Sequence, residues 1–258
     1  MRRLLLSLLH QWPLLVPLAL AACGDGAAGL DRLSEGERGR VVSVRSGDTV
    51  MLAQGLVVRL AGIEVPHEGE VGAETARADL ARLVQGREVQ LLYGGARRDS
   101  HGRGLAQLRV TEGRGWVQGA LLRDGFARVR TFADNRAMAQ PMLDDEARAR
   151  AAKRGLWGSS GFQVRLPGEI DPSTGGFQIV EGRVQRVTTT RWGVYLDFSE
   201  SRNGFAALVS NHGAADLAAA GLAPTTLAAR LVRLRGPIGW NAVMTIDHPE
   251  QIEVLRDR

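Results

Sequence analysis

Short apolar runs separated by tight-turn residues follow one another along the first third of the chain. Residues 41–44, 49–52 and 56–63 are apolar or β-branched, and the segments 46–48 and 53–55 between them are rich in Gly, Ser and Asp. Runs of this length with turn residues at their ends are typical of strands. We therefore expect an antiparallel meander of three strands from the first run to the last.

Helix and strand patterns continue to residue 158. Apolar or small residues recur at helical spacing over residues 74–84, and this run stops before Gly86. The other elements that we expect are strands at 89–93, 105–110 and 127–130 and helices at 117–123 and about 141–154. Five strands with helices between and after them fit an OB-type barrel. The predicted fold class is mainly β with helices (α+β).

A second strand-rich unit follows a segment that contains Pro167, Pro172 and several glycines. Its Ala- and Leu-rich stretch at 213–221 indicates a helix. Its expected strands lie at 179–187, 193–198, 205–209, 231–236, 242–246 and 252–255. Because the element order repeats that of the first unit, we expect a second OB-like barrel in tandem with the first.

These patterns divide the chain into five segments. The expected segments are a leader at 1–22, a tether at 23–39, the first domain at 40–158, a linker at 159–178 and the second domain at 179–258.

The leader has the character of an export signal. Arg2 and Arg3 precede an apolar run over residues 4–20, and Cys23 follows directly after Ala21 and Ala22. Polar residues and prolines interrupt the run, which favours a cleaved signal over a membrane span.

The cysteine at the end of this signal resembles the acylated residue of bacterial lipoproteins. The resemblance implies a lipid on Cys23, attachment to a membrane and a place in the cell envelope, on its periplasmic or exterior face. The alternatives are an ordinary signal with an incidental cysteine, or a buried thiol. Cys23 is the sole cysteine of the chain, which excludes an intramolecular disulfide and a cysteine-based metal site.

Charge is distributed unevenly along the first domain. The whole chain carries a formal charge of +5, and Lys153 is its single lysine, so the basic side chains are almost all arginine. Arginine suits bidentate contacts with phosphate. Residues 97–130 carry eight arginines against three acids, whereas residues 64–79 carry five acids and one arginine. A phosphate-binding face beside a cation-binding face is what metal-assisted phosphodiester chemistry needs.

Three segments of the first domain resemble the staphylococcal nuclease family. They are Ser46-Gly47-Asp48-Thr49-Val50, Arg59-Leu60-Ala61-Gly62-Ile63-Glu64-Val65-Pro66-His67 and Asp99-Ser100-His101-Gly102-Arg103-Gly104-Leu105-Ala106, and the likeness covers about residues 40–158 up to the ending Gly155-Leu156-Trp157. Each segment is short, but the order and spacing of the three segments together match the family. The resemblance implies a small barrel that hydrolyses phosphodiester bonds with calcium.

The resemblance also assigns roles to individual residues. It implies that Asp48, Glu64 and the backbone carbonyl of Val65 hold Ca²⁺, a hard cation that prefers oxygen ligands. Arg59 and Arg103 would bind the phosphate and stabilise its developing charge. The substrates would be DNA or RNA without sequence preference, and no obligate protein partner is evident. The alternatives are that Asp48 is only a turn residue, that Glu64 is only a solvated loop acid and that Arg59 only covers the outer face of a strand.

The sequence departs from the family pattern next to the expected metal ligands. Glu64 stands where the family usually has Asp, and Val65 where it often has Thr. His67 replaces the acid that would act as general base. A neutral imidazole is a competent base, but Glu68 or Glu70 could take the role instead. The alternative function is a catalytically impaired barrel that binds nucleic acid or acts as an envelope scaffold.

Two further possibilities come from the residues alone. His67, His101 and Glu64 could together hold zinc, since histidine is a favoured zinc ligand. The second domain could bind nucleic acid, or its aromatic residues could fill the core and its arginines cover the surface. The residues in question there are Arg183, Arg186, Arg191, Trp192, Tyr195, Phe198, Arg233 and Arg235. Residues 195–198 and 247–252 also resemble an OB-like module of other bacterial proteins.

Overall fold

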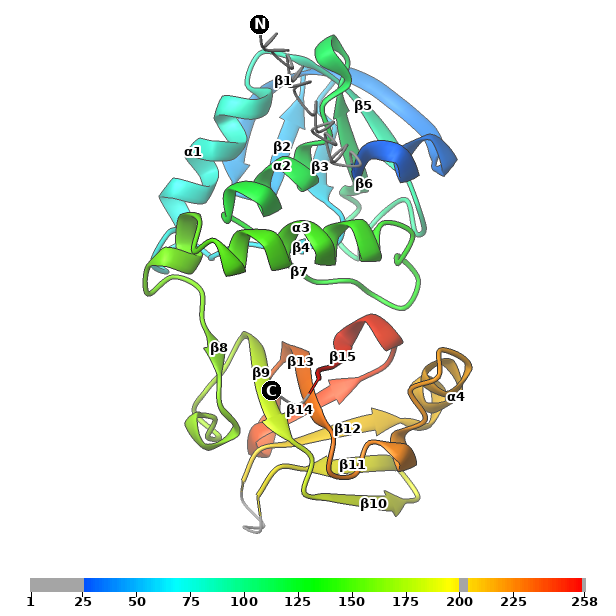
Figure 1. Ribbon diagram of the computed structural model, residues 1–258. Helices are drawn as coiled ribbons and strands as arrows, with labels where there is room; N and C mark the ends of the chain where they lie inside the picture. The colour runs from blue at the N-terminus through cyan, green and yellow to red at the C-terminus, as the bar shows by residue number, and fades with distance from the viewer. Residues whose placement is uncertain (1–25, 200–203, 257–258) are drawn as a thin grey trace, which may run out of the picture.

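The computed structural model describes residues 26–199 and 204–256, so the expected leader and Cys23 lie outside the described residues. The described chain forms two units, one above the other in Figure 1. The elements of the first unit are η1 (Gly26–Arg32), β1 (Ser34–Ser46), β2 (Thr49–Leu52), β3 (Val57–Leu60), β4 (Ile63–Glu64), α1 (Ala73–Val84), β5 (Glu88–Tyr93), β6 (Gly104–Val110), η2 (Glu112–Arg114), α2 (Val117–Asp124), β7 (Arg128–Val129), α3 (Ala139–Ala151) and η3 (Gly155–Gly158).

Five strands of the first unit close into a barrel in the order β1-β2-β3-β6-β5. The last half of β1 pairs antiparallel with β2, and its first half pairs with β5, so this one long strand closes the barrel. β2 pairs antiparallel with β3, and β3 pairs in parallel with β6. Fully buried aliphatic residues, among them Val50, Leu52, Val58, Leu91 and Leu108, fill the interior. The expected meander and barrel are confirmed.

The residues expected to form a tether belong in part to the barrel. Residues 34–40 are the first half of β1 and pair with β5, and Leu30 in η1 is fully buried. The side chains of residues 34–40 are exposed or half-buried, so this strand lacks an apolar period and is held by its backbone hydrogen bonds. Glu37 accepts hydrogen bonds from Tyr93 Oη and Arg98 Nη2, both at 2.6 Å. These two bonds lower the pKa of Glu37 to about 2.

Three helices cover one side of the barrel (Figure 1). α1 buries Ala76, Leu80 and Val84, which recur at intervals of four residues and therefore share one helix face. α2 ends at Gly125, whose φ of 79° is the left-handed conformation that glycine adopts most readily. Among the described residues, none of the helices has the length and apolar character needed to span a membrane.

The second unit begins inside the segment that we expected to be a linker. Phe162 is buried, and the backbone of Val164 and Arg165 pairs in parallel with β9. The elements from here on are β8 (Val164–Arg165), η4 (Pro167–Glu169), β9 (Phe177–Arg183), β10 (Arg186–Thr190), β11 (Gly193–Asp197), β12 (Ala206–Ser210), α4 (Asn211–Ala219), η5 (Pro224–Thr226), β13 (Leu231–Pro237), η6 (Trp240–Ala242), β14 (Val243–Ile246), η7 (Pro249–Gln251) and β15 (Ile252–Val254).

The described strands of the second unit form two four-stranded sheets and not the closed barrel that we expected. One sheet has the order β10-β11-β12-β14 and the other β15-β13-β9-β8. Buried residues of both sheets, such as Leu196 and Val209 in one and Val180 and Leu234 in the other, pack into one core. The strand that we expected at 179–187 is divided into β9 and β10, which belong to different sheets, so the chain changes sheet where a barrel strand would continue.

Most of the candidate nucleic-acid residues in the second unit have structural partners. Phe198 is part of the core. Arg186 pairs with Asp197, and Arg233 pairs with two glutamates. Trp192 differs, because 63% of its surface is exposed. These placements favour the interpretation that the residues fill and cover the sheets.

A buried ion-pair network joins the two units. Arg235 of β13 is 2% exposed, and its guanidinium contacts Glu146 of α3 at 3.0 Å and Glu253 of β15 at 2.6 Å. Glu146 is fully buried and also accepts a hydrogen bond from the backbone N–H of Val129 at 2.6 Å. The β7–α3 side of the barrel unit therefore faces the sheet that contains β13 (Figure 1).

Candidate active site

Asp48 lies in the turn between β1 and β2 and is almost buried. Its Oδ1 accepts hydrogen bonds from the hydroxyls of Ser46 at 2.7 Å and Thr49 at 2.8 Å. Its backbone carbonyl accepts a hydrogen bond from the N–H of Leu60 at 2.7 Å, which fixes the turn against β3. Gly47 is needed here, because a Cβ on it would lie 2.9 Å from the Cβ of Ala76. The turn thus holds the second carboxylate oxygen, Oδ2, toward Arg59.

Arg59 joins Asp48 to Glu64. Its neighbours Val58 and Leu60 point into the barrel core, so Arg59 lies on the opposite face of β3. Its Nε contacts Asp48 Oδ2 at 3.1 Å, and its Nη2 lies 3.6 Å from Glu64 Oε2. One guanidinium therefore touches both of the carboxylates that we expected to bind the metal. Arg59 therefore does not only cover the outer face of the strand.

Glu64 is a buried carboxylate surrounded by cationic or potentially cationic groups. Its side chain is 3% exposed, and its Oε2 lies 2.8 Å from Arg130 Nη1. Its Oε1 lies 3.1 Å from His67 Nε2. A buried charge requires such partners, because it has lost the stabilisation of water. The sequence motifs do not single out Arg130, although its alternation with buried Val129 in the expected strand at 127–130 is a usable signal.

Arg103 is held by its own loop. Asp99 accepts hydrogen bonds from Arg103 Nε at 2.7 Å and from the backbone N–H groups of His101 at 2.9 Å and Arg103 at 3.0 Å. Burial alone would raise the pKa of Asp99, but these hydrogen bonds outweigh burial and lower it. Arg103 and Arg59 line one cavity of about 310 Å³. The two arginines expected to bind phosphate thus face the same space.

The three candidate general bases are placed differently. His67 is largely exposed and contacts Glu64 through its ring. Glu70 accepts a hydrogen bond from the backbone N–H of His67 at 2.8 Å, and both line a cavity with Glu64. Glu68 lines a different cavity, beside Arg77. Its side chain is therefore the least suited of the three to the role.

The residues that we expected to bind a metal fit a hard cation in part. Asp48 and Glu64 present two carboxylates to one guanidinium, so a single cation placed there would meet both. Calcium prefers such oxygen donors. Within the described residues, however, no three acids or histidines are grouped as a metal site. The proposed zinc cluster is thus not formed: His67 contacts Glu64, whereas His101 lines the cavity of Arg59 and Arg103.

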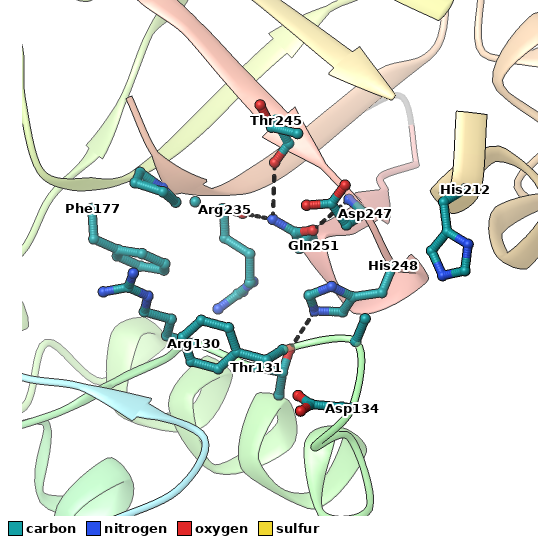
Figure 2. Close-up of a pocket in the computed structure, with 14 residues that line it drawn as sticks. Arg130, Thr131, Asp134, Phe177, His212, Arg235, Thr245, Asp247, His248 and Gln251 are labelled. Carbon is teal, nitrogen blue, oxygen red and sulfur yellow. Dashed lines mark hydrogen bonds between the residues drawn. The ribbon is translucent and has the colours of Figure 1, made fainter. Parts of the chain in front are cut away.

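The second unit borders this site. A cavity of about 420 Å³ between the units is lined by Arg130 and Phe132 on one side and by Arg235 and His248 on the other (Figure 2). Its wall is held by a hydrogen bond of 2.8 Å between Thr131 Oγ1 and His248 Nε2. Phe132 also lines the cavity of Arg59 and Arg103, so the two cavities adjoin.

The comparison with protein families agrees with this arrangement. The family model described as staphylococcal nuclease homologue matches residues 57–159. This part of the chain is a staphylococcal nuclease domain. Arg59, Glu64 and Arg103 fall inside the matched range of the nuclease domain, whereas Asp48 precedes it. Among curated proteins, none matches the chain.

Proposed function

We propose that this chain is a calcium-dependent nuclease that hydrolyses phosphodiester bonds of DNA and RNA. The observation that carries the proposal is the position of Arg59. Its guanidinium contacts both Asp48 and Glu64 and lines the same cavity as Arg103. Carboxylates for a cation and guanidiniums for a phosphate thus meet at one place in the nuclease domain.

In this proposal, Arg59 and Arg103 bind the non-bridging oxygens of the scissile phosphate. Both side chains are fixed beforehand, Arg59 by Asp48 and Arg103 by Asp99. A donor that is already in place stabilises developing charge without the cost of reorganisation. Guanidinium also offers two parallel N–H groups to a phosphate, which a lysine does not.

Asp48, Glu64 and the backbone carbonyl of Val65 would hold the calcium ion. When bound, Ca²⁺ supplies positive charge next to the phosphate and to the attacking water.

The proton of the attacking water would pass to His67 or Glu70. His67 is the better placed of the two, because its ring contacts Glu64 and its exposed position allows the proton to leave to solvent. Glu70 lines the same cavity and is bound to the backbone of His67.

Substrates would be recognised by their backbone and not by their sequence. The arginines of the cavity would bind phosphates, which carry no sequence information. Phe132 is 44% exposed beside them and offers an aromatic face on which any base can stack. DNA and RNA strands are therefore equally suitable.

Anchoring in the cell envelope through a lipid on Cys23 is part of the proposal and has its own test. Expression in a bacterial host with labelled palmitate should yield a labelled membrane-bound protein, and Cys23→Ala should yield an unlabelled one. Equal labelling of both would contradict the anchor without affecting the nuclease.

Nicking of supercoiled plasmid tests the nuclease itself. We expect the chain from residue 24 onward to nick DNA in calcium, and a chelator to abolish nicking. Arg103→Ala should slow the reaction by about 100-fold or more, as the loss of a charge-stabilising donor does in other enzymes. Equal traces in all three samples would support the alternative, a catalytically impaired barrel with a binding or scaffold role.

One contact favours the alternative of a catalytically impaired barrel. Arg130 already neutralises Glu64 at 2.8 Å. A guanidinium at this distance competes with calcium for the same oxygen. The alternative predicts that the chain binds a single strand with equal affinity in calcium and in chelator.

A further inference from the structure

A second cavity is lined by Glu64 and is distinct from the cavity of Arg59 and Arg103. It has a volume of about 390 Å³ and is lined by Glu64, His67 and Glu70 of the nuclease domain, by residues 160–163 and Arg165, and by residues 175–178 at and just before the start of β9. The second unit therefore supplies part of the wall of a cavity that reaches the proposed metal ligand.

Arg128 enters this cavity from β7. Arg128 is paired with Glu64 across the β4–β7 ladder, and Arg130 lies two residues further along. Side chains two residues apart point to the same face of a strand, so both arginines lie on the face of Glu64. Arg130 contacts Glu64, whereas Arg128 has no carboxylate within ion-pair distance among the residues that the structure describes.

The guanidinium of Arg128 is held in place by the second unit. It lies over the ring of Phe162 at 4.7 Å and that of Phe177 at 5.0 Å. Its Nη1 donates a hydrogen bond of 3.1 Å to the carbonyl of Phe177. Its Nε is buried and lacks an acceptor within the described part of the chain. A fixed, stacked guanidinium with donors to spare is well suited to bind an anion.

Burial of the charged Arg128 guanidinium costs free energy unless an anion lies beside it. Desolvation lowers the pKa of Arg128, although the charges of Glu64 and Glu146 oppose the effect. Glu64 does not need Arg128 as a partner, since it already has Arg59 and Arg130.

Arg165 of β8 brings a second positive charge to the same cavity. Its Nε donates to Gln178 Oε1 at 3.2 Å, a neutral acceptor. In the described ranges, no carboxylate lies within ion-pair distance of Arg165. Two guanidiniums that form no ion pair among the described residues thus share this cavity with Glu64 and Glu70, one guanidinium from each unit.

We propose that Arg128 and Arg165 form a second phosphate subsite, which binds the backbone phosphate of a nucleotide next to the one being cut. The inference rests on the proposed function for the identity of the anion as a nucleic-acid strand. It gives the second unit a role: β8 and β9 extend the substrate cleft beyond the nuclease domain.

Binding to a single strand in a chelator tests the subsite separately from cutting. The probe is a fluorescently labelled single-stranded hexathymidylate, and its anisotropy is followed against protein concentration at several salt concentrations. We expect Arg128→Gln and Arg165→Gln each to weaken binding by about tenfold, as the loss of a charge-assisted hydrogen bond does. Each should also reduce the slope of log affinity against log salt by about 0.7, the value for one phosphate contact on a single strand.

Arg230→Gln is the matched control. This exposed arginine precedes β13 at the end of the β9–β13 pair that is remote from Phe177, so it removes the same charge outside the cavity. It should change affinity by less than twofold. If Arg128→Gln does not fold, Arg165→Gln still tests the subsite, because Arg165 makes fewer contacts. Equal affinities for the Arg165 and Arg230 variants would overturn the proposal.

Two more measurements separate the possible failures. Inorganic phosphate, at the same concentration of phosphate groups, should compete far less well than unlabelled hexathymidylate; equal competition would contradict a strand-binding subsite.

If the chain binds the strand through Arg128 and Arg165 but does not cut it in calcium, the nuclease proposal fails and the subsite stands. If cutting of the hexamer has the same KM in the Arg165 and Arg230 variants, the subsite fails and the nuclease stands.

Discussion

One arginine of the candidate active site, Arg59, lies between two carboxylates. A lysine could not replace Arg59 in this position, because Arg59 contacts two different acids, Asp48 through Nε and Glu64 through Nη2. A lysine offers one point charge and reaches only one of them.

Arg59→Lys should therefore reduce the rate of cleavage by about 10- to 100-fold, less than the roughly 100- to 1,000-fold lost when a transition-state donor is removed altogether, because lysine keeps the positive charge. The measurement is the initial rate on a single-stranded oligonucleotide in saturating calcium. Arg45→Lys is the control, since Arg45 is an exposed arginine on another barrel strand, β1. A variant at Arg59 as fast as its control would show that the bridging geometry is irrelevant to the chemistry.

Arg130 makes a second prediction at this scale. In the proposed mechanism Arg130 competes with calcium for Glu64, so Arg130→Met should lower the calcium concentration needed for half-maximal cleavage. Arg59 still lies beside Glu64 after this change, so we expect a moderate shift of about 3- to 10-fold, equivalent to about 1 kcal/mol. Calcium titration of the cleavage rate provides the measurement. A higher calcium requirement would mean that Arg130 positions Glu64 for the metal instead of competing with it.

At the scale of elements, the sequence predicted those strands and helices whose apolar residues alternate or recur. The barrel strands, α1 and α2 were found in this way, and the turn that carries Asp48 was located by its Gly and Asp. The expected tether and linker were wrong in part, because residues 34–40 and 164–165 are strands held by backbone pairing and have little apolar pattern.

The same reasoning explains which parts of the site were found. Arg59, Glu64 and Arg103 lie in local motifs, so the sequence indicated them. Arg130 and Phe177 reach the site from segments far along the chain, and contacts of that kind leave no local pattern. The two sheets of the second unit were missed for a similar reason, since pairing between distant strands decides whether a barrel closes.

Gly125 provides a test at the scale of elements. It ends α2 with a φ of 79°, and a Cβ there would lie 2.2 Å from the carbonyl oxygen of Arg154. Gly125→Ala should therefore lower the free energy of unfolding by more than the roughly 1–2 kcal/mol that the left-handed backbone alone costs. Urea denaturation gives the difference. Gly86→Ala is the control, since its φ is 73° but no described atom lies within 4 Å of the added Cβ. Equal losses would show that the close approach to Arg154 is relieved elsewhere.

At the scale of the whole molecule, the interface between the units contains a titratable contact. His248 is buried, and its Nε2 lies 2.8 Å from Thr131 Oγ1 across the interface. Burial lowers the pKa of His248, with the charge of Arg136 acting in the same direction and those of the nearby acids against it. The acids in question are Asp216, Asp247 and Glu250.

This shift predicts a loss of stability in mild acid. Below pH about 6.5, the ordinary pKa of histidine, the unfolded chain binds a proton that the folded chain resists, so the free energy of unfolding falls as the pH decreases. The loss ends once the pH is below the lowered pKa of the folded state. Thermal unfolding between pH 8 and 5 should show a steeper decline in Tm for the natural protein than for His248→Gln. Parallel declines would assign the pH dependence to other groups.

The central claim is that Asp48 and Glu64 bind one calcium ion beside a phosphate held by Arg59 and Arg103. The most direct test is the rate of oligonucleotide cleavage as a function of calcium concentration, for the natural chain and for Asp48→Asn, Glu64→Gln and Asp134→Asn. Asp134 lines the same cavity but makes no ion pair with Arg59 among the described residues, so it is the matched control. We predict that the first two substitutions raise the half-saturating calcium concentration by about tenfold or more, the effect of losing one charged ligand, and that the third leaves it unchanged. Superimposable curves for all four proteins, or cleavage that persists in a chelator, would contradict the claim.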